Sequence, residues 1–255
     1  MNKFIKWLIQ PNYFWMTLMQ VMLPVYVYLA VISDADWLWW LGSIVFYFLY
    51  LAIGNNIGMH RYYCHRYFTM NRPTEWFVAW CAMMGCMGSP ICYAGIHQVH
   101  HRLHDSDQDP HGLQRGWNSV LYYFHRQIDQ KEIKFSRNIA DLTKRYGLVH
   151  QFYWPFVFAN AAIFYLISWK ALLFLWLIPA SLTLWAVALV LLMQHDQEGP
   201  SNSRAYMWFG WGETWHKNHH IDQTLTDHSL GNGIDWTYQL SRLLANDQSN
   251  TNKNN

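Results

Sequence analysis

The stretch 171–194, ALLFLWLIPASLTLWAVALVLLMQ, contains no charged residue and is followed directly by His195. About 20 apolar residues in a helix cross the hydrocarbon core of a bilayer, so this stretch predicts a membrane span. The stretches 8–33, 37–54 and 151–169 are also uncharged and predict three more spans. The first two and the last two of these four spans predict two helical hairpins.

The composition agrees with a membrane protein. Charged residues make up 13 % of the 255 residues and hydrophobic residues 52 %, whereas soluble domains carry about 25 % charged residues. This composition excludes a disordered chain and a small disulfide scaffold, and it disfavours an ordinary soluble enzyme. A net charge of +2 gives no indication of nucleic-acid binding, and we expect none. We expect one domain over 1–245 and a disordered, Asn-rich tail over 246–255.

Charge placement predicts the orientation. With four spans, all of the 18 Lys and Arg residues except Lys170 lie on one side. Basic loops are retained on the cytoplasmic side, so both termini, 55–150 and 195–245 are expected to be cytoplasmic. The uncharged stretch 76–96 is interrupted by Gly and Pro, and it fits either a span or a membrane-embedded hairpin. If 76–96 crossed the membrane, the histidines that precede it and those that follow it would lie on opposite sides. Placing them on one side therefore requires that 76–96 does not cross.

Nine histidines are clustered near the predicted cytoplasmic ends of the spans. They are His60 and His65, the HxxHH group His97, His100 and His101, the single His195, and a second HxxHH group, His216, His219 and His220. Residues at i, i+3 and i+4 share one helix face, so each HxxHH trio could converge on one buried centre. Adjacent histidines, about 100° apart on a helix, need not bind the same ion.

His60 and His65 are about 140° apart on an α-helix, so the helix unwinds there or the two bind different ions. Imidazole ligands suit Zn, Cu, Fe and Ni, and one such ion takes at most about six ligands. Nine histidine ligands therefore imply two ions. The other histidines are interpreted as surface or hydrogen-bonded core residues: His104, His111, His125, His150 and His228.

The three histidine boxes resemble those of membrane fatty acid desaturases, and in particular of the acyl-CoA (delta-9, stearoyl-CoA type) branch. The stretch 60–66, HRYYCHR, looks like HRxxxHR. The stretch 97–111 looks like HxxHH followed by D-x-D-P-H. The stretch 212–220, GETWHKNHH, looks like GEGxHxxHH with Thr214 in place of the second Gly. The resemblance covers about 37–244.

This resemblance implies an all-α integral membrane protein with four transmembrane helices and a cytoplasmic helical cap that holds a di-iron centre. It assigns as ligands His60, His65, His97, His100, His101, His195, His216, His219 and His220. Carboxylates that orient these imidazoles are expected first at Glu213, Asp105 and Asp109, with Asp107 and Asp235 as further candidates. No catalytic residue beyond the metal centre is expected, and no substrate-binding residue is assigned. Leu191 stands where the branch usually has an Asn that holds a metal-bound water. Whether this chain binds that water stays open.

The implied reaction is insertion of a cis double bond into a fatty acyl chain, with O2 as co-substrate. Two electrons come from an external donor such as ferredoxin or cytochrome b5 with its reductase, because no flavin, haem or nicotinamide site is expected in the chain. Acyl-CoA is the first expected substrate. Acyl carrier protein or a membrane glycerolipid stays open as the acyl carrier, because Gln98 stands where that branch often has Arg.

Two rival functions use the same residues. A membrane di-iron hydroxylase of a lipid, alkane or sterol would also need histidine boxes. A metal transporter would not be an enzyme, but transporters place ligands near the bilayer midplane, whereas these histidines lie beyond the span ends. A bacterial inner membrane is favoured over the endoplasmic reticulum, since the chain shows no fused electron-transfer domain.

Overall fold

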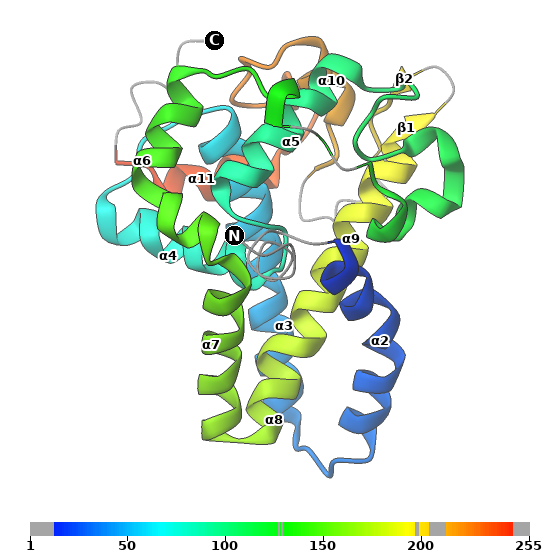
Figure 1. Cartoon of the computed structure of the whole chain (residues 1–255), viewed down its shortest axis with the longest axis vertical. Helices are drawn as coiled ribbons and strands as arrows, with labels where there is room; N and C mark the ends of the chain where they lie inside the picture. The colour runs from blue at the N-terminus through cyan, green and yellow to red at the C-terminus, as the bar shows by residue number, and fades with distance from the viewer. Residues whose placement is uncertain (1–12, 127, 129, 197–198, 204–212, 247–255) are drawn as a thin grey trace.

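The computed structural model describes residues 13–126, 128, 130–196, 199–203 and 213–246. Long helices form a bundle at one end of the molecule, and shorter helices and loops form a cap at the other (Figure 1). The predicted tail, apart from Asn246, lies outside the described residues. The bundle contains α2 (Tyr13–Val31), α3 (Trp37–Phe48) with η1 (Leu49–Cys64), α7 (Tyr153–Ile167), and α8 (Trp169–Leu172) with η5 (Leu173–Leu177) and α9 (Ile178–Gln194).

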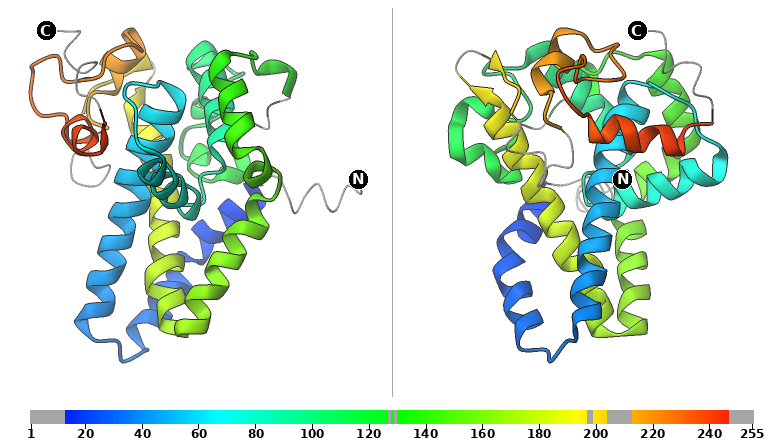
Figure 2. Two further views of the ribbon diagram at one scale, coloured as in Figure 1. Left: turned by 90° about the vertical axis from the view of Figure 1, so that its left-hand side faces the viewer. Right: turned by 180° about the vertical axis from the view of Figure 1, so that it is seen from behind.

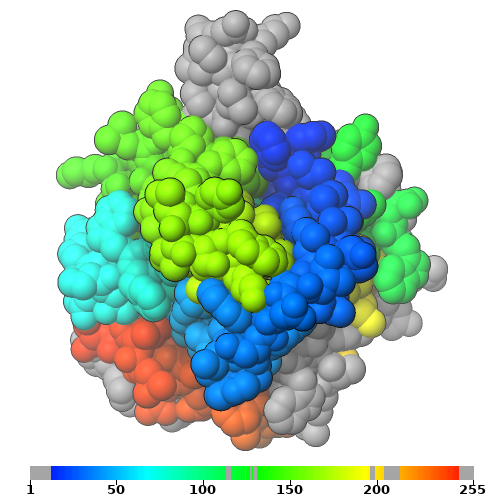
Figure 3. Space-filling view, turned by 90° about the horizontal axis from the view of Figure 1, so that it is seen from below, coloured from blue at the N-terminus to red at the C-terminus, as the bar shows by residue number. Residues whose placement is uncertain are grey.

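Three of these helical stretches are long and apolar enough to cross a membrane: Tyr13–Val31, Trp37–Cys64 and Trp169–Gln194. The predicted span 151–169 corresponds to α7, which has 15 residues and is shorter than the other three. Large apolar side chains on the outer faces are exposed, including Val31 at 67 % and Leu166 at 82 %. Such surfaces fit contact with lipid better than contact with water. Figure 3 shows this end of the bundle from below, with the cap spreading around it.

The second predicted span differs from the structure at its end. The sequence predicted a span that stops at 54, but the helix continues without a break to Cys64. Its second part, η1, is a π-helix, in which hydrogen bonds run from residue i to i+5. The extension carries His60 out of the bundle and into the cap.

The segment 76–96 forms parts of two helices rather than a continuous span. They are α4 (Arg72–Met84) and α5 (Pro90–Leu103). The Ser89 side chain accepts a hydrogen bond from the Cys92 backbone N–H, and Pro90 occupies the first turn, so a new helix begins there. In Figure 1, α4 lies across the bundle at the base of the cap and α5 rises into it.

Two glycines allow η1 and α4 to pack closely. A Cβ on Gly54 would lie 2.5 Å from the backbone N of Ala82, and one on Gly58 would lie 2.6 Å from Cγ1 of Val78. Glycine is the residue that permits such close approach of two backbones. This contact holds η1 against α4 and sets the position of His60.

The cap is completed by short elements. They are η2 (Leu113–Val120), η3 (Tyr122–Phe124), η4 (Gln130–Glu132), α6 (Arg137–Gln151), β1 (His195–Asp196), β2 (Gly199–Pro200), α10 (His216–Ile221) and α11 (Trp236–Leu244). The antiparallel β1–β2 pair, two residues on each side, is a small departure from the expected all-α fold. It turns the chain directly after α9. Figure 2 shows α11 beside η1.

Candidate metal centre

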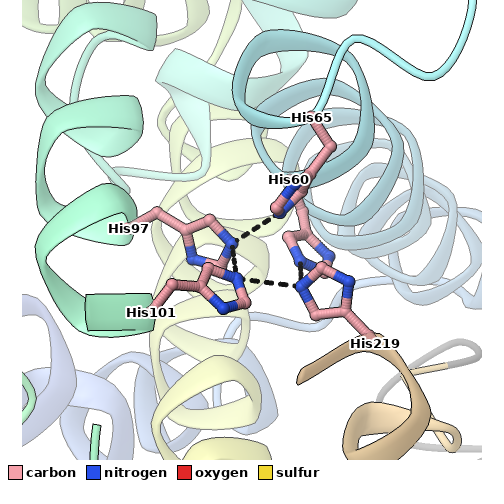
Figure 4. A group of neighbouring side chains, drawn as sticks. All are labelled: His60, His65, His97, His101 and His219. Carbon is pink, nitrogen blue, oxygen red and sulfur yellow. Dashed lines mark hydrogen bonds between the residues drawn. The ribbon is translucent and has the colours of Figure 1, made fainter. Parts of the chain in front are cut away.

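Five histidines form the first cluster, called here the five-histidine group. His60 and His65 come from η1 and its C-terminal cap, His97 and His101 from α5, and His219 from α10. One ring nitrogen of each lies within 4.8 Å of those of the other four. Figure 4 shows their rings facing one another. The Nε2 atoms of His60 and His219 are 3.0 Å apart, and those of His97 and His101 are 2.8 Å apart.

The other four histidines form a second cluster, the four-histidine group. His100 comes from α5, His195 from β1, and His216 and His220 from α10. The Nε2 atom of His216 lies 2.9 Å from that of His195 and 3.0 Å from that of His220. The structure therefore brings all nine predicted histidines together, in groups of five and four.

The helical argument from spacing was wrong for the HxxHH trios. Instead of converging on one centre, each trio divides between the two groups. The i,i+4 pair of α5, His97 and His101, faces the five-histidine group, and His100 faces the other. On α10 the i,i+4 pair faces the four-histidine group, and His219 faces the first. Adjacent histidines thus serve different groups, as their separation of about 100° allowed.

The alternatives for His60 and His65 also need correction. Both belong to the same group, and the helix between them is continuous but has the wider π geometry. In a π-helix residues five apart are hydrogen-bonded to each other, and the backbone N–H of His65 donates to the carbonyl of His60 at 3.3 Å. The two side chains therefore lie on the same side of η1, although an α-helix would separate them.

Carboxylates contact the Nδ1 atoms of three clustered histidines. His195 Nδ1 lies 2.9 Å from Oδ1 of Asp105, and His100 Nδ1 lies 3.1 Å from Oδ2 of Asp109. His60 Nδ1 lies 3.4 Å from Oε2 of Glu213. A proton on Nδ1 leaves the lone pair of the neutral ring on Nε2, the atom that faces the cluster. Asp105, Asp109 and Glu213 are three of the five candidate carboxylates, whereas Asp235 pairs with Arg61 instead.

Burial favours the neutral form of several of the clustered rings. Removal from water, together with the neighbouring imidazoles, lowers the pKa of His101 to about 3. The same causes lower the pKa values of His97, His100, His216 and His219 well below 6.5. Neutral imidazole is the form that binds metal. These five rings therefore each present a lone pair near neutral pH.

The donor set fits a cation. If neither Nε2 carries a proton, Nε2 atoms about 3 Å apart, such as those of His60 and His219, repel one another unless a positive ion lies between them. Nε2 of His100 is buried and has no hydrogen-bond partner among the described residues. Ligands consisting of imidazole nitrogens suit Fe, Zn, Cu or Ni rather than Mg or Ca. The residues present therefore fit two transition-metal ions.

A cavity of about 60 Å³ adjoins both groups. Its lining includes His60, His97, His216 and Glu213, together with Tyr93 and His111. Its remaining lining comes mainly from η1 and α9: Leu51, Asn55, Asn56, Met87, Val187, Val190 and Leu191. The cavity thus places apolar side chains of η1 and α9 beside the clustered histidines.

Two contacts near the cluster were not predicted from the sequence. The hydroxyl oxygen of Tyr67 lies 3.2 Å from Nδ1 of His219. His228, expected to be a surface or core residue, stacks on His219 with ring centroids 4.7 Å apart. Their separation along the chain left no local signal, except that Tyr67 follows His65 by two residues. His111 also lies closer than expected, in a cluster with His100 and Asp109.

No family model matches the chain. Over 206 residues it is 26 % identical to the Delta-9 acyl-lipid desaturase 1 of Arabidopsis thaliana, covering 72 % of this chain and 64 % of that protein, just under two thirds of its length. Over 235 residues it is 26 % identical to the sn-1 stearoyl-lipid 9-desaturase of Anabaena variabilis, covering 80 % of each. The sn-2 palmitoyl-lipid 9-desaturase of Nostoc sp. is 26 % identical over 222 residues, covering 77 % of this chain and 73 % of that protein. These similarities support the fatty acid desaturase family and, with it, an oxidoreductase of the desaturase kind.

Proposed function

We propose that the chain desaturates a fatty acyl chain in a membrane, using two iron ions held by the nine clustered histidines. The observation that carries the proposal is the arrangement of these histidines in groups of five and four beside a mainly apolar cavity. The similarity to named desaturases supports the same reaction. Acid–base side chains alone cannot remove hydrogen from an unactivated methylene.

The iron pair would supply the oxidising power, so that two hydrogens leave adjacent carbons while O2, two electrons and two protons yield two waters. The protein's own part is to hold and orient. Asp105, Asp109 and Glu213 orient three of the imidazoles. The apolar wall of the cavity holds the acyl chain and excludes water. The electrons come from an external donor such as ferredoxin or cytochrome b5 with its reductase.

A glycerolipid is the acyl carrier that the relatives favour. The names of the Anabaena and Nostoc proteins specify stearoyl-lipid and palmitoyl-lipid. Acyl-CoA, the first expectation from the histidine boxes, has no counterpart in these names. We therefore propose an acyl chain esterified in a membrane lipid, with desaturation at position 9, and retain acyl-CoA as an outcome to be tested.

The proposal includes four membrane crossings, with α7 as the shortest. The cap then lies on the cytoplasmic side, with both chain ends, in a bacterial inner membrane. The three long apolar helices support the membrane location, and the bias of basic residues supports the orientation.

The test is expression in a host that lacks its own desaturase, followed by mass spectrometry of the fatty acids with location of the double bond. The wild-type chain is compared with the double variant His100→Ala, His219→Ala, which removes one ligand from each group. His150→Gln is the matched control, because His150 bonds to Ser89 away from both groups. We expect a new monounsaturated acid with the wild-type chain and the control, and none with the double variant.

The lipid fraction identifies the carrier. If the new double bond appears first in glycerolipids, the lipid substrate is supported. If it appears first in acyl-CoA, acyl-CoA is the substrate, as the histidine boxes first suggested. A hydroxy acid would assign the chain to the hydroxylases. Cellular metal uptake that depends on the chain, without any new lipid, would assign it to the transporters.

A further inference from the structure

Tyr67 is buried against the five-histidine group, and its hydroxyl has three partners. It donates to the backbone carbonyl of Gln223 at 3.0 Å. Nδ1 of His219 lies 3.2 Å from the same oxygen, and Nε2 of His228 lies 3.3 Å from it. A phenol has one proton and a carbonyl oxygen can only accept, so that proton points to Gln223. Both imidazoles must then donate to the Tyr67 oxygen.

Arg61 independently requires the same protonation of His228. Its Nη2 lies 3.0 Å from Nδ1 of His228. A guanidinium group donates and cannot accept, so Nδ1 of His228 must be the acceptor. The neutral His228 ring therefore carries its proton on Nε2, which faces Tyr67. Two separate contacts thus agree on one tautomer.

The Arg61 guanidinium is itself held firmly. Its Nη2 donates to both carboxylate oxygens of Asp235, at 2.8 and 3.1 Å, and its Nη1 donates to the carbonyl of Thr226 at 2.7 Å. Arg61 and Asp235 are each 1 % exposed. Asp235 also accepts from the backbone N–H groups of His228 and Tyr238. A buried pair with this many hydrogen bonds has one defined orientation.

We propose that Tyr67 and His228 are positioning residues, which transmit the orientation of the Arg61–Asp235 pair to His219 and hold the His219 Nε2 lone pair toward the five-histidine group. With Nδ1 donating to Tyr67, the free lone pair of His219 is on Nε2. That atom lies 3.0 Å from Nε2 of His60 and 3.0 Å from Nε2 of His101. The inference rests on the proposed metal-binding role of this group.

His219 differs in this respect from the histidines that face a carboxylate. Asp105, Asp109 and Glu213 can each add negative charge to the imidazole beside them, whereas the Tyr67 oxygen is part of a neutral phenol. His219 is therefore the weaker electron donor, and its place in the group depends on the direction of one hydrogen bond. Loss of the Tyr67 hydroxyl should weaken metal binding at the five-histidine group and leave the four-histidine group unchanged.

The experiment is a Co²⁺ titration of the full chain, freed of metal by a chelator in detergent, followed by visible absorption. Tyr67→Phe is compared with the wild-type chain and with Tyr146→Phe. Tyr146 is a suitable control because its buried hydroxyl bonds to Glu75 and Tyr63 and contacts no clustered histidine. We expect Tyr67→Phe to lower the affinity for one of two ions by about 10- to 100-fold, the effect seen for partners of ligand histidines.

A second pair of variants tests the direction of the hydrogen bonds. His228→Gln retains an acceptor for Arg61 and a donor for Tyr67, whereas His228→Leu retains neither. We expect His228→Gln to bind the first ion more tightly than His228→Leu. Thermal unfolding of each metal-free variant separates a lost fold from a lost ligand.

Four results would overturn the proposal. Tyr67→Phe could bind both ions as the wild-type chain does. Tyr146→Phe could lose as much affinity as Tyr67→Phe, which would place the effect in the fold. His228→Gln could bind no better than His228→Leu. A wild-type chain that binds no Co²⁺ would overturn the proposed metal centre as well, so the two failures are distinguishable.

Discussion

At the scale of single residues, Asp105 allows a test with little disturbance of the backbone. Its φ of 59° is in the left-handed region, which Asn tolerates well. Asp105→Asn therefore preserves the chain path and an acceptor oxygen, but removes the negative charge beside Nδ1 of His195. We expect Asp105→Asn to weaken metal binding at the four-histidine group about 10-fold. The variant should therefore retain less iron per chain than the wild-type chain after dialysis against a chelator.

Asp34→Asn is the matched control for this change. Asp34 also has a positive φ, 49°, and is exposed in the turn between α2 and α3, at the far end of the molecule from the clusters. It should retain iron as the wild-type chain does. Equal retention in Asp105→Asn and in the control would show that the Asp105 carboxylate does not support the metal.

The sequence predicted the members of the site better than their partners. All nine histidines and the carboxylates Asp105, Asp109 and Glu213 lie together in the structure. These residues could be predicted because the spacing and order of the histidine boxes are visible in the sequence. Tyr67 and His228 were missed, since their contacts with His219 and Arg61 depend on how distant segments pack. His228 is separated from Arg61 by 167 positions, and no local pattern encodes such a contact.

At the scale of elements, the π-helical form of η1 places His60 and His65 in one group, which their spacing in the sequence did not predict. His60 and His65 are five positions apart, which would separate their rings on an α-helix, but the i→i+5 bonds of η1 align them. The boundaries of the helices were also hard to predict. The second predicted span ended at 54, where Gly54 begins a polar stretch. The helix continues to Cys64 because packing against α4 compensates for the glycines and asparagines.

That packing predicts the effect of Gly54→Ala. The new Cβ would lie 2.5 Å from Ala82 N and 2.7 Å from Ala82 Cα, and backbone atoms cannot move aside as a side chain can. The two helices must separate, and overpacking of this kind costs about 1–3 kcal/mol. We expect a lower thermal unfolding temperature in detergent and reduced iron content, because His60 moves with η1.

Gly147→Ala is the control for a glycine in the middle of a helix. Nothing lies within 4 Å of a Cβ at Gly147 in α6. Alanine there should stabilise the chain by about 0.5–1 kcal/mol, since glycine is the weaker helix former. If Gly54→Ala unfolded at the wild-type temperature, the close contact between η1 and α4 would not limit stability.

At the scale of the whole molecule, the loops at the end of the bundle indicate how many times the chain crosses the membrane. Nζ of Lys170 donates to the carbonyl of Asp34 at 3.4 Å, so the turn 32–36 and the start of α8 lie at the same end. Helix α7, which leads to Lys170, has 15 residues, equivalent to about 22 Å. A hydrocarbon core is about 30 Å thick. If α7 crosses, the bilayer must thin locally beside it, which costs only fractions of a kcal/mol per Å.

Cysteine labelling in a bacterial host decides between three crossings and four. In intact spheroplasts, a membrane-impermeant maleimide should label Asp36→Cys and Lys170→Cys, and it should label Lys144→Cys in α6 only after permeabilisation. The wild-type chain gives the background, because Cys81 and Cys86 are buried and Cys64 and Cys92 are half-buried. Lys170→Cys is the critical variant, since α7 alone separates it from α6. If it labelled together with Lys144→Cys, α7 would not cross, and its exposed Leu166 and Ile167 would need another partner than the hydrocarbon core.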